Sequence, residues 1–448
     1  MQEFNNMPEQ EPQRKRRLLT VKQKFILTCF FGVCWLFVVT LINVPWIIQL
    51  SDHVTLIFAA IAITVIAIIP SFWYAFTLVG FLIDTRPESK TITEYPGVSV
   101  LVAAYNEEDC IVDTVFSLTK QEYPGEVEII IIDDGSTDNT MARLKAIKLP
   151  NLVVLEVPHQ GKAAALNAGL NKAKNELLVT IDADTYLLPD AIKSIVAHLL
   201  SSLPDTAAVA GSVCVRNSRT NILTKVQEWN YFNEFISQKR IQSLFQSTLV
   251  AQGAFSVYRK SAVIEAGGWP KSVGEDIVLT WAILKKGYRT GFCESAFSFT
   301  FVPSNYKKLF LQRSRWSQGM LEALSSHPGL LLRKEFSTLF IWWNLLIPIV
   351  DLGYGFIFLP GVVAACFGYY FIAGPMTVSV VPLILLNNFV FFWRNRKEFV
   401  KRKLSVRRNM LGYVIFLFLY QPFIMVPAAI HGYFSYFLGR RKWGTKKE

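Results

Sequence analysis

The chain has 448 residues, of which 52% are hydrophobic and only 18% are charged. This composition is too apolar for an ordinary soluble protein of this length, and it predicts membrane-spanning segments. The formal net charge is +12, but much of the excess lies in "RNRKEFVKRKLSVRR" and "GRRKWGTKKE", which border apolar segments. Basic runs beside membrane spans typically meet anionic lipid, so we exclude nucleic acid as a partner and expect the lipid bilayer instead.

Long apolar segments flank a hydrophilic middle. Residues 25–85 contain no Lys or Arg and are long enough for two helical spans of about 20 residues each. Residues 336–393 contain a single charge, Asp351, and predict two more spans. A further C-terminal span is predicted over residues 410–438.

The basic residues predict how the chain crosses the membrane. Arg14 to Arg17 place the N-terminus in the cytoplasm by the positive-inside rule, and the first apolar segment is too long for a signal peptide. Two spans then return the chain, so we expect a multi-pass protein of the cell (inner) membrane with a cytoplasmic hydrophilic domain. The side of the basic tail stays open, because five spans put it outside, whereas a segment bent at Pro422 and Pro427 puts it inside.

The predicted organisation has eight parts. In chain order they are a basic cytoplasmic N-terminus (1–24), two transmembrane helices (25–85), a cytoplasmic hydrophilic domain (96–300), interfacial helices (301–335), two transmembrane helices (336–393), a basic cytoplasmic loop (394–409), a C-terminal transmembrane segment (410–438) and a basic tail (439–448).

The hydrophilic middle has an α/β pattern. Short apolar runs rich in β-branched residues, "VSVLVAA", "EVEIIII", "LVVLEV" and "LLVTI", alternate with helical stretches, which predicts a parallel sheet with helices on both faces. Ligands of such sheets bind beyond the carboxyl ends of the strands. Polar residues follow three of the predicted strands, namely Asn106 and Glu107, Asp133 and Asp134, and Asp182 and Asp184. No dinucleotide-binding or P-loop glycine motif is present.

The pair in "DAD" points to a metal. Asp182 and Asp184 repel each other unless a cation lies between them, and hard carboxylate oxygens suit Mg²⁺ or Mn²⁺. In contrast, the acids of "DDGST" are equally well explained as caps of the following helix, with Gly135 in a turn.

Three further motifs each allow two interpretations. Glu275 and Asp276 open a predicted helix, where acids are favoured, but a carboxylate there also suits a general base. Lys162 lies at a helix start that suits phosphate, or it is simply solvated. The Arg and Trp of "QRSRW" suit either anchoring at the membrane surface or a binding role.

Taken in order, "VLVAAYNEE", "IIIIDDGSTD", "GKAAALNAG", "TIDADT", "GED" and "QRSRW" resemble family 2 of the glycosyltransferases. More narrowly, with the flanking spans, they resemble the membrane-embedded processive synthases of cellulose, chitin, hyaluronan and poly-N-acetylglucosamine. The resemblance covers residues 98–320 closely. It implies a GT-A type, Rossmann-like mixed sheet inserted between transmembrane helices, and a hexosyltransferase that inverts the anomeric centre.

The resemblance also implies residue roles. Nucleotide-sugar binding falls to Tyr105, Glu107, Asp134, Lys162 and Asp182.

On the same basis, Asp184 is the direct ligand of Mg²⁺ or Mn²⁺, and Glu275 and Asp276 are the catalytic pair, with Asp276 as the base. The chain departs from the family at Gly274, where many members have Thr or Ser, and this leaves the fine positioning of the base open. The acceptor and pyrophosphate end of the site is formed by Gln312, Arg315 and Trp316.

We therefore expect polymerisation of a sugar from a UDP-sugar, UDP-N-acetylglucosamine first, into an extracellular β-linked biofilm polysaccharide that is extruded through the membrane helices. The partners are the UDP-sugar donor and the growing polysaccharide, and small membrane or periplasmic accessory subunits are compatible with this function. One alternative is transfer of a single sugar to a lipid phosphate, which has no need of "QRSRW". The other is a transporter with a nucleotide-sensing domain, which the scarcity of charge within the spans disfavours.

Overall fold

The structure, a computed structural model, describes residues 18–86, 92–374, 377–378, 380–404 and 408–440. The basic cluster from Arg14 to Arg17, on which the predicted orientation depends, lies outside the described residues. So do most of the basic C-terminal tail and residues 405–407 of the basic loop.

An eight-stranded mixed sheet forms the hydrophilic middle, in the order β3-β2-β1-β4-β7-β6-β8-β5. The four strands that the sequence predicts from buried apolar runs pair in parallel. The sheet becomes mixed beyond β4, because β7 runs antiparallel to both β4 and β6. The strands are β1 (Val98–Ala104), β2 (Val127–Asp133), β3 (Leu152–Glu156), β4 (Leu177–Asp182), β5 (Tyr186–Leu187), β6 (Thr206–Val215), β7 (Phe255–Arg259) and β8 (Arg289–Thr300).

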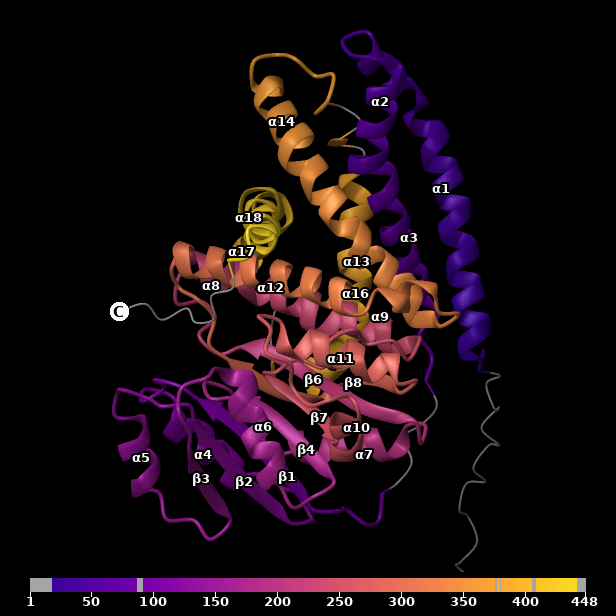
Figure 1. Cartoon of the computed structure of the whole chain (residues 1–448). Helices are drawn as coiled ribbons and strands as arrows, with labels where there is room; N and C mark the ends of the chain where they lie inside the picture. The colour runs from indigo at the N-terminus through magenta and orange to yellow at the C-terminus, as the bar shows by residue number, and fades with distance from the viewer. Residues whose placement is uncertain (1–17, 87–91, 375–376, 379, 405–407, 441–448) are drawn as a thin grey trace, which may run out of the picture.

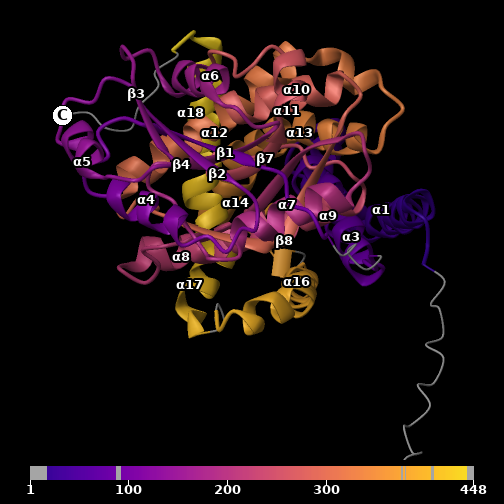
Figure 2. The same cartoon turned by 90° about the horizontal axis from the view of Figure 1, so that it is seen from below.

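Helices cover both faces of the sheet, as Figure 2 shows for the view from below. Alternate residues of β1 point to opposite faces, so Val100 belongs to the buried cluster that includes α4 and α7, whereas Leu101 belongs to the cluster that includes α6, α10 and α11. Burial on both faces explains why the strands read as continuous apolar runs. These helices are α4 (Ile111–Thr119), α6 (Lys162–Lys172), α7 (Ala191–Ser201), α10 (Lys260–Glu265) and α11 (Glu275–Lys285), and α5 (Thr140–Ala146) follows β2.

Four helices in the described part of the chain are long and apolar enough to cross a membrane: Val21–Ser51, Leu56–Leu82, Phe336–Cys366 and Met410–Phe437. The first of them is α1 (Val21–Ser51), and each of the other three is interrupted by a π-helical segment. The second consists of α2 (Leu56–Ile63), η1 (Thr64–Ile68) and α3 (Ile69–Leu82), and the third of α13 (Phe336–Gly353), η4 (Tyr354–Phe358) and α14 (Leu359–Cys366). The fourth consists of α17 (Met410–Ile415), η6 (Phe416–Met425) and α18 (Val426–Phe437). These apolar helices make the protein a membrane protein, and α1, α3, α13 and α14 rise from one side of the sheet domain in Figure 1.

The second span predicted within residues 336–393 falls on α16 (Val381–Lys401). This helix is not among the four long apolar ones, because its second half carries basic residues. Its first half packs beside α3, where the Asn387 Nδ2 group donates to the Thr77 hydroxyl over 3.2 Å. The predicted number of five spans therefore stays a prediction.

An aromatic core joins the membrane helices to the sheet domain. Trp73 of α3 stacks on Trp343 of α13 with ring centroids 4.6 Å apart, and Phe340 belongs to the same buried cluster as Trp281 of α11. The layer between them, visible below α13 in Figure 1, contains α12 (Tyr306–Ser326), α8 (Ile222–Tyr231), η2 (Phe232–Gln238), α9 (Lys239–Leu244) and η3 (Pro328–Leu332). The "QRSRW" motif lies on α12 in this layer.

Candidate active site

The carboxyl ends of β1, β2 and β4 meet at one edge of the sheet, because these strands run parallel. The register places Asp133 opposite Ala104 and Asp182 opposite Ala103. The polar groups predicted to bind the donor therefore share this edge. They are Tyr105, Glu107, Asp134 and Asp182.

Asp134 fixes the loop that leads into α6. Its buried carboxylate accepts the backbone N–H groups of Gln160 and Gly161, each over 2.9 Å, and His159 Nδ1 lies 2.9 Å from Asp134 Oδ2. Gly161 has a φ of 96°, a conformation that favours glycine. The Tyr105 ring stacks on His159 with centroids 4.1 Å apart. The sequence did not single out His159, which here joins the predicted Tyr105 and Asp134.

Lys162 bridges two carboxylates from different elements. Its Nζ atom lies 2.5 Å from Asp182 Oδ1 and 3.2 Å from Glu275 Oε1. Burial alone lowers the pKa of Lys162, but these two carboxylates raise it above its ordinary value. Burial raises the pKa of Glu275, an effect that Lys162 opposes and Asp276 adds to. The Lys162 ammonium is thus held in its charged form at the junction of β4 and α11.

Asp184 is an acid whose charge is poorly compensated by its surroundings. Its Oδ1 atom accepts the Thr300 hydroxyl over 2.9 Å, yet burial and then the Asp182 carboxylate raise the pKa of Asp184 to about 6. A hard divalent cation would stabilise this carboxylate, so the residues fit Mg²⁺ or Mn²⁺. Within the described ranges there is no group of three or more His, Cys, Asp or Glu able to hold a metal ion, so such a cation needs further oxygen ligands, such as those of a diphosphate.

Asp276 lies in the first turn of α11, and its two carboxylate oxygens are held by backbone groups. Oδ1 accepts the Ile277 N–H over 2.8 Å, and Oδ2 accepts the Gly253 N–H over 3.2 Å. Gly253 also passes so close to Lys162 that a Cβ atom there collides with the Lys162 Nζ atom. The predicted base therefore has a fixed orientation beside the Lys162 bridge.

Two glycines let α12 dock on the first turn of α11. A Cβ atom added to Gly274 lies only 2.7 Å from the Gly319 Cα atom, so neither position has room for a side chain. The Glu322 carboxylate of α12 accepts the Val273 N–H over 2.8 Å and the Gly274 N–H over 3.4 Å. In this chain, the departure from the family pattern at Gly274 thus has a structural reason: the backbone of α12 occupies the space.

The docking brings "QRSRW" to the carboxylates. Burial lowers the pKa of Arg315, and the nearby carboxylates of Glu275 and Asp182 oppose this effect. The Arg315 Nε and Gln312 Oε1 atoms are buried and have no hydrogen-bond partner among the described residues. Trp316 is 36% exposed and makes an edge contact with Phe235 of η2, with centroids 5.4 Å apart.

Arg313, the second residue of the motif, was not singled out from the sequence. It is fully buried, its Nε atom donates to the Tyr420 hydroxyl over 2.8 Å, and its guanidinium lies 3.7 Å above the Trp316 ring. Its two Nη atoms have no hydrogen-bond partner in the described part of the chain. A basic residue next to a membrane segment suggests a lipid contact, and only the fold reveals that Arg313 faces inward and supports Trp316.

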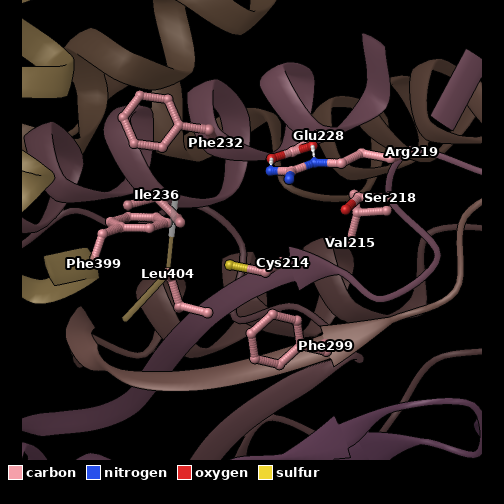
Figure 3. A pocket seen from close by; sticks show the side chains of 10 residues that line it. All are labelled: Cys214, Val215, Ser218, Arg219, Glu228, Phe232, Ile236, Phe299, Phe399 and Leu404. Atoms are coloured by element: carbon pink, nitrogen blue, oxygen red, sulfur yellow. Dashed lines mark hydrogen bonds and ion pairs between the residues drawn. The ribbon is translucent and has the colours of Figure 1, made fainter. Parts of the chain in front are cut away.

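A cavity of about 120 Å³ lies away from these residues, between β6, β8, α8, η2 and the end of α16 (Figure 3). Its walls are mostly apolar, with an ion pair between Arg219 and Glu228 at 3.1 Å. None of the predicted site residues lines it. The lining residues are Cys214, Val215, Ser218, Arg219, Glu228, Phe232, Ile236, Phe299, Phe399 and Leu404.

The family model and the relatives that this chain matches agree on one enzyme family. Residues 99–267 match the model described as glycosyl transferase family 2. The chain is 33% identical over 288 residues to a poly-beta-1,6-N-acetyl-D-glucosamine synthase of Staphylococcus aureus, covering 63% of this chain and 67% of the relative. The synthase of the same name from Staphylococcus epidermidis is 34% identical over 263 residues, covering 56% of this chain and 63% of the relative.

Among solved structures, the mannosyltransferase PcManGT of Pyrobaculum calidifontis, in complex with GDP-Man and Mn²⁺, superimposes with a TM-score of 0.56. It is 20% identical and covers 85% of this chain and 99% of its own, so it shows a shared GT-A fold. The family model spans the sheet edge that holds the strand-end carboxylates, and apolar helices flank it on both sides. The chain therefore belongs to glycosyl transferase family 2 and is a membrane glycosyltransferase.

Proposed function

We propose that this enzyme polymerises N-acetylglucosamine from UDP-N-acetylglucosamine into an extracellular β-linked polysaccharide. The similarity to the staphylococcal poly-beta-1,6-N-acetyl-D-glucosamine synthases supports the choice of sugar. The observation that carries the proposal is the docking of α12 on α11 through Gly274 and Gly319. This contact supports a single site in which the strand-end carboxylates bind the donor and the "QRSRW" motif binds the acceptor.

The donor occupies the sheet edge. The stacked pair of Tyr105 and His159 offers an aromatic surface for a uracil base, and Asp134 acts through the loop that it fixes. Lys162 and Arg315 place two cations beside the acidic cluster, where they would balance the charge of the diphosphate. Glu107, two residues after Tyr105, is held by its backbone N–H, which donates to the Thr140 hydroxyl at the start of α5 over 2.8 Å.

Asp276 is the general base. The acceptor hydroxyl oxygen attacks the anomeric carbon while the bond from that carbon to the β-phosphate oxygen breaks, and the hydroxyl proton passes to the Asp276 carboxylate. The leaving group is UDP, and attack from the opposite face inverts the anomeric centre. The N–H groups of Gly253 and Ile277 hold the carboxylate in one orientation throughout.

Asp184, with Asp182 beside it, would hold Mg²⁺ or Mn²⁺, which supplies positive charge for the diphosphate when bound. The Thr300 hydroxyl orients the Asp184 carboxylate toward this role. Asp182 forms an ion pair with Lys162, so Asp184 is left as the direct ligand of the cation.

The polymer leaves along the membrane helices. The α12 helix lies directly on α18, where the Ser314 hydroxyl and His431 Nδ1 are 2.8 Å apart and Gly432 packs against the Ser314 backbone. The Arg313 bond to Tyr420 joins the acceptor motif to η6. These contacts support extrusion of the growing chain beside the acceptor motif. The positive-inside rule supports a multi-pass protein whose sheet domain faces the cytoplasm.

Purified protein in detergent or nanodiscs, supplied with Mg²⁺ or Mn²⁺ and a panel of UDP-sugars, tests the proposal. We expect UDP release with UDP-N-acetylglucosamine and a product of many sugar units. If the product is instead a single sugar attached to an added polyprenyl phosphate, the enzyme transfers one sugar and does not polymerise. The absence of UDP release with every donor would contradict the proposal as a whole.

A further inference from the structure

Lys239 is a buried cation that the proposed chemistry does not use. It is the first residue of α9, directly after the π-helical η2, and its side chain is buried in the sheet domain. Its ammonium donates to the Val250 backbone carbonyl oxygen. No carboxylate of the described residues lies within ion-pair distance of it, although burying a Lys without a paired acid is costly.

The segment that Lys239 binds is the one that holds the base. Three residues after Val250, the Gly253 N–H donates to Asp276 Oδ2 over 3.2 Å. Between them, the Ala251 N–H donates to the Thr280 hydroxyl over 3.0 Å, and that hydroxyl donates to the Asp276 backbone carbonyl over 2.7 Å. Lys239 thus contacts one end of the 250–253 segment, whose other residues are bonded to α11.

The charges of this region act on one another. Burial lowers the pKa of Lys239 to about 7, while the carboxylates of Asp276 and Glu234 oppose this effect. Lys239 and Asp276 are thus electrostatic partners without a direct contact. The other ionisable groups that act on Asp276 or Glu234 are Glu275 on α11, Lys162 on α6, Tyr258 on β7, Arg313 on α12, Tyr74 on α3 and Tyr420 on η6.

The next residue explains why Lys239 stays in place. Arg240 pairs with Asp84, at the end of the second apolar helix, over 2.6 Å, and it also pairs with Glu294 of β8. Its Nη1 atom donates to the Asn395 side chain of α16 over 3.1 Å. Three elements therefore pin the start of α9, and the adjacent Lys239 is directed at the 250–253 segment from a fixed backbone.

We propose that Lys239 is a positioning residue for the general base: its ammonium holds residues 250–253 against α11 and so fixes the orientation of the Asp276 carboxylate. The inference rests on the proposed function, because it takes Asp276 as the base. It adds a residue to the site that touches neither donor nor acceptor.

The test compares full-length variants in the UDP-release assay over a range of pH. Lys239→Met removes the ammonium with little change in length, and Lys239→Arg restores a cation. Lys286→Met is the matched control, because Lys286 is exposed and lies 3.8 Å from Glu265, away from the site. Binding of UDP by each variant reports whether the donor half is folded.

We expect Lys239→Met to lower kcat about 10-fold with an unchanged KM for the donor, and to move the acid limb of the pH–rate profile up by about one unit. Lys239→Arg should recover part of kcat and return the acid limb toward its original position. A folded Lys239→Met enzyme with wild-type kcat and pH profile would overturn the inference. If Lys239→Met does not bind UDP, the kcat and the pH–rate profile of Lys239→Gln are measured instead, and wild-type values of both would overturn the inference.

Asp276→Asn separates this inference from the function on which it rests. An inactive Asp276→Asn enzyme together with an unaffected Lys239→Met enzyme refutes only the role of Lys239. An Asp276→Asn enzyme with wild-type activity refutes Asp276 as the base, and the role of Lys239 falls with it.

Discussion

The two halves of the proposed site, one for the donor and one for the acceptor, are built in different ways. The donor half lies at the ends of neighbouring parallel strands, and its key carboxylate, Asp134, is bonded to backbone N–H groups of the same domain. The acceptor half is assembled from α12, η2 and the C-terminal membrane helix, and it contains buried polar atoms of Gln312, Arg313 and Arg315 without partners among the described residues.

Buried polar atoms without partners are costly, so their concentration in one half of the site suggests a polar ligand there. A sugar chain offers hydroxyl groups and ring oxygens to such atoms and apolar ring faces to Trp316. The donor half, in contrast, fixes its own side chains through Lys162 and Asp134. We therefore expect substitutions in the two halves to separate donor binding from chain extension.

The largest effect is expected at the point where the halves meet. Asp276→Asn removes the base and keeps only one of the Gly253 and Ile277 N–H contacts, because an amide has a single acceptor oxygen, so turnover should fall about 10²–10⁴-fold while UDP binding remains. Polymer yield and calorimetric UDP binding measure the two effects. Near-normal polymer yield would exclude Asp276 as the base.

A change within the donor half should instead weaken nucleotide binding. Asp184→Asn removes the hard anionic ligand, so turnover should fall about 100-fold and UDP affinity should lose its dependence on Mn²⁺. Chelation of divalent ions should abolish wild-type activity. Full activity in the presence of a chelator would refute the metal assignment.

The contact between α11 and α12 can be opened without removing a polar group. Gly274→Thr forces the Gly319 backbone away, so polymer formation should fall about 10-fold through misalignment. Gly329→Ala is the control, since a Cβ atom at Gly329 meets nothing within 4 Å. Equal activity of the two variants would show that close docking of α12 is not required.

The smallest effect concerns the fold rather than either half. Burial, and to a lesser degree Arg86, lowers the pKa of His198 in α7 to about 4. Because this value lies below that of an unfolded His, the folded state resists protonation. The stability contributed by neutral His198 is therefore complete above about pH 6.5 and is lost as the pH falls toward 4.

We expect the free energy of unfolding to fall by about 2 kcal/mol between pH 7.5 and pH 5 from this residue. His198→Gln should reduce the pH dependence of the unfolding temperature over that range. An unchanged slope would mean that His198 does not resist protonation, and it would leave both halves of the site as described.

The donor half was predictable because its residues follow strands that the sequence reveals. Runs such as "VSVLVAA" are buried on both faces, so they are continuous, and in a parallel sheet their polar ends must converge. The antiparallel β7 was not foreseen, because "FSVYR" is short and only its tertiary pairing with β4 and β6 defines it.

The acceptor half was predictable in composition but not in geometry. A pair of glycines far apart in sequence, Gly274 and Gly319, has no local signature, although it decides where α12 lies. Arg313 and Lys239 are likewise invisible, because a basic residue on a helix near a membrane suggests solvent or lipid, and only tertiary packing buries them.

The most direct test of the two-half account is the Trp316→Leu enzyme, with Trp342→Leu as a control, since Trp342 is exposed on α13 away from the carboxylates. UDP binding and polymer length are measured on the same preparation. We predict wild-type UDP affinity with loss of chain extension for Trp316→Leu, and wild-type values of both for Trp342→Leu. Polymer of wild-type length from Trp316→Leu would contradict the account and return Trp316 to a membrane anchor.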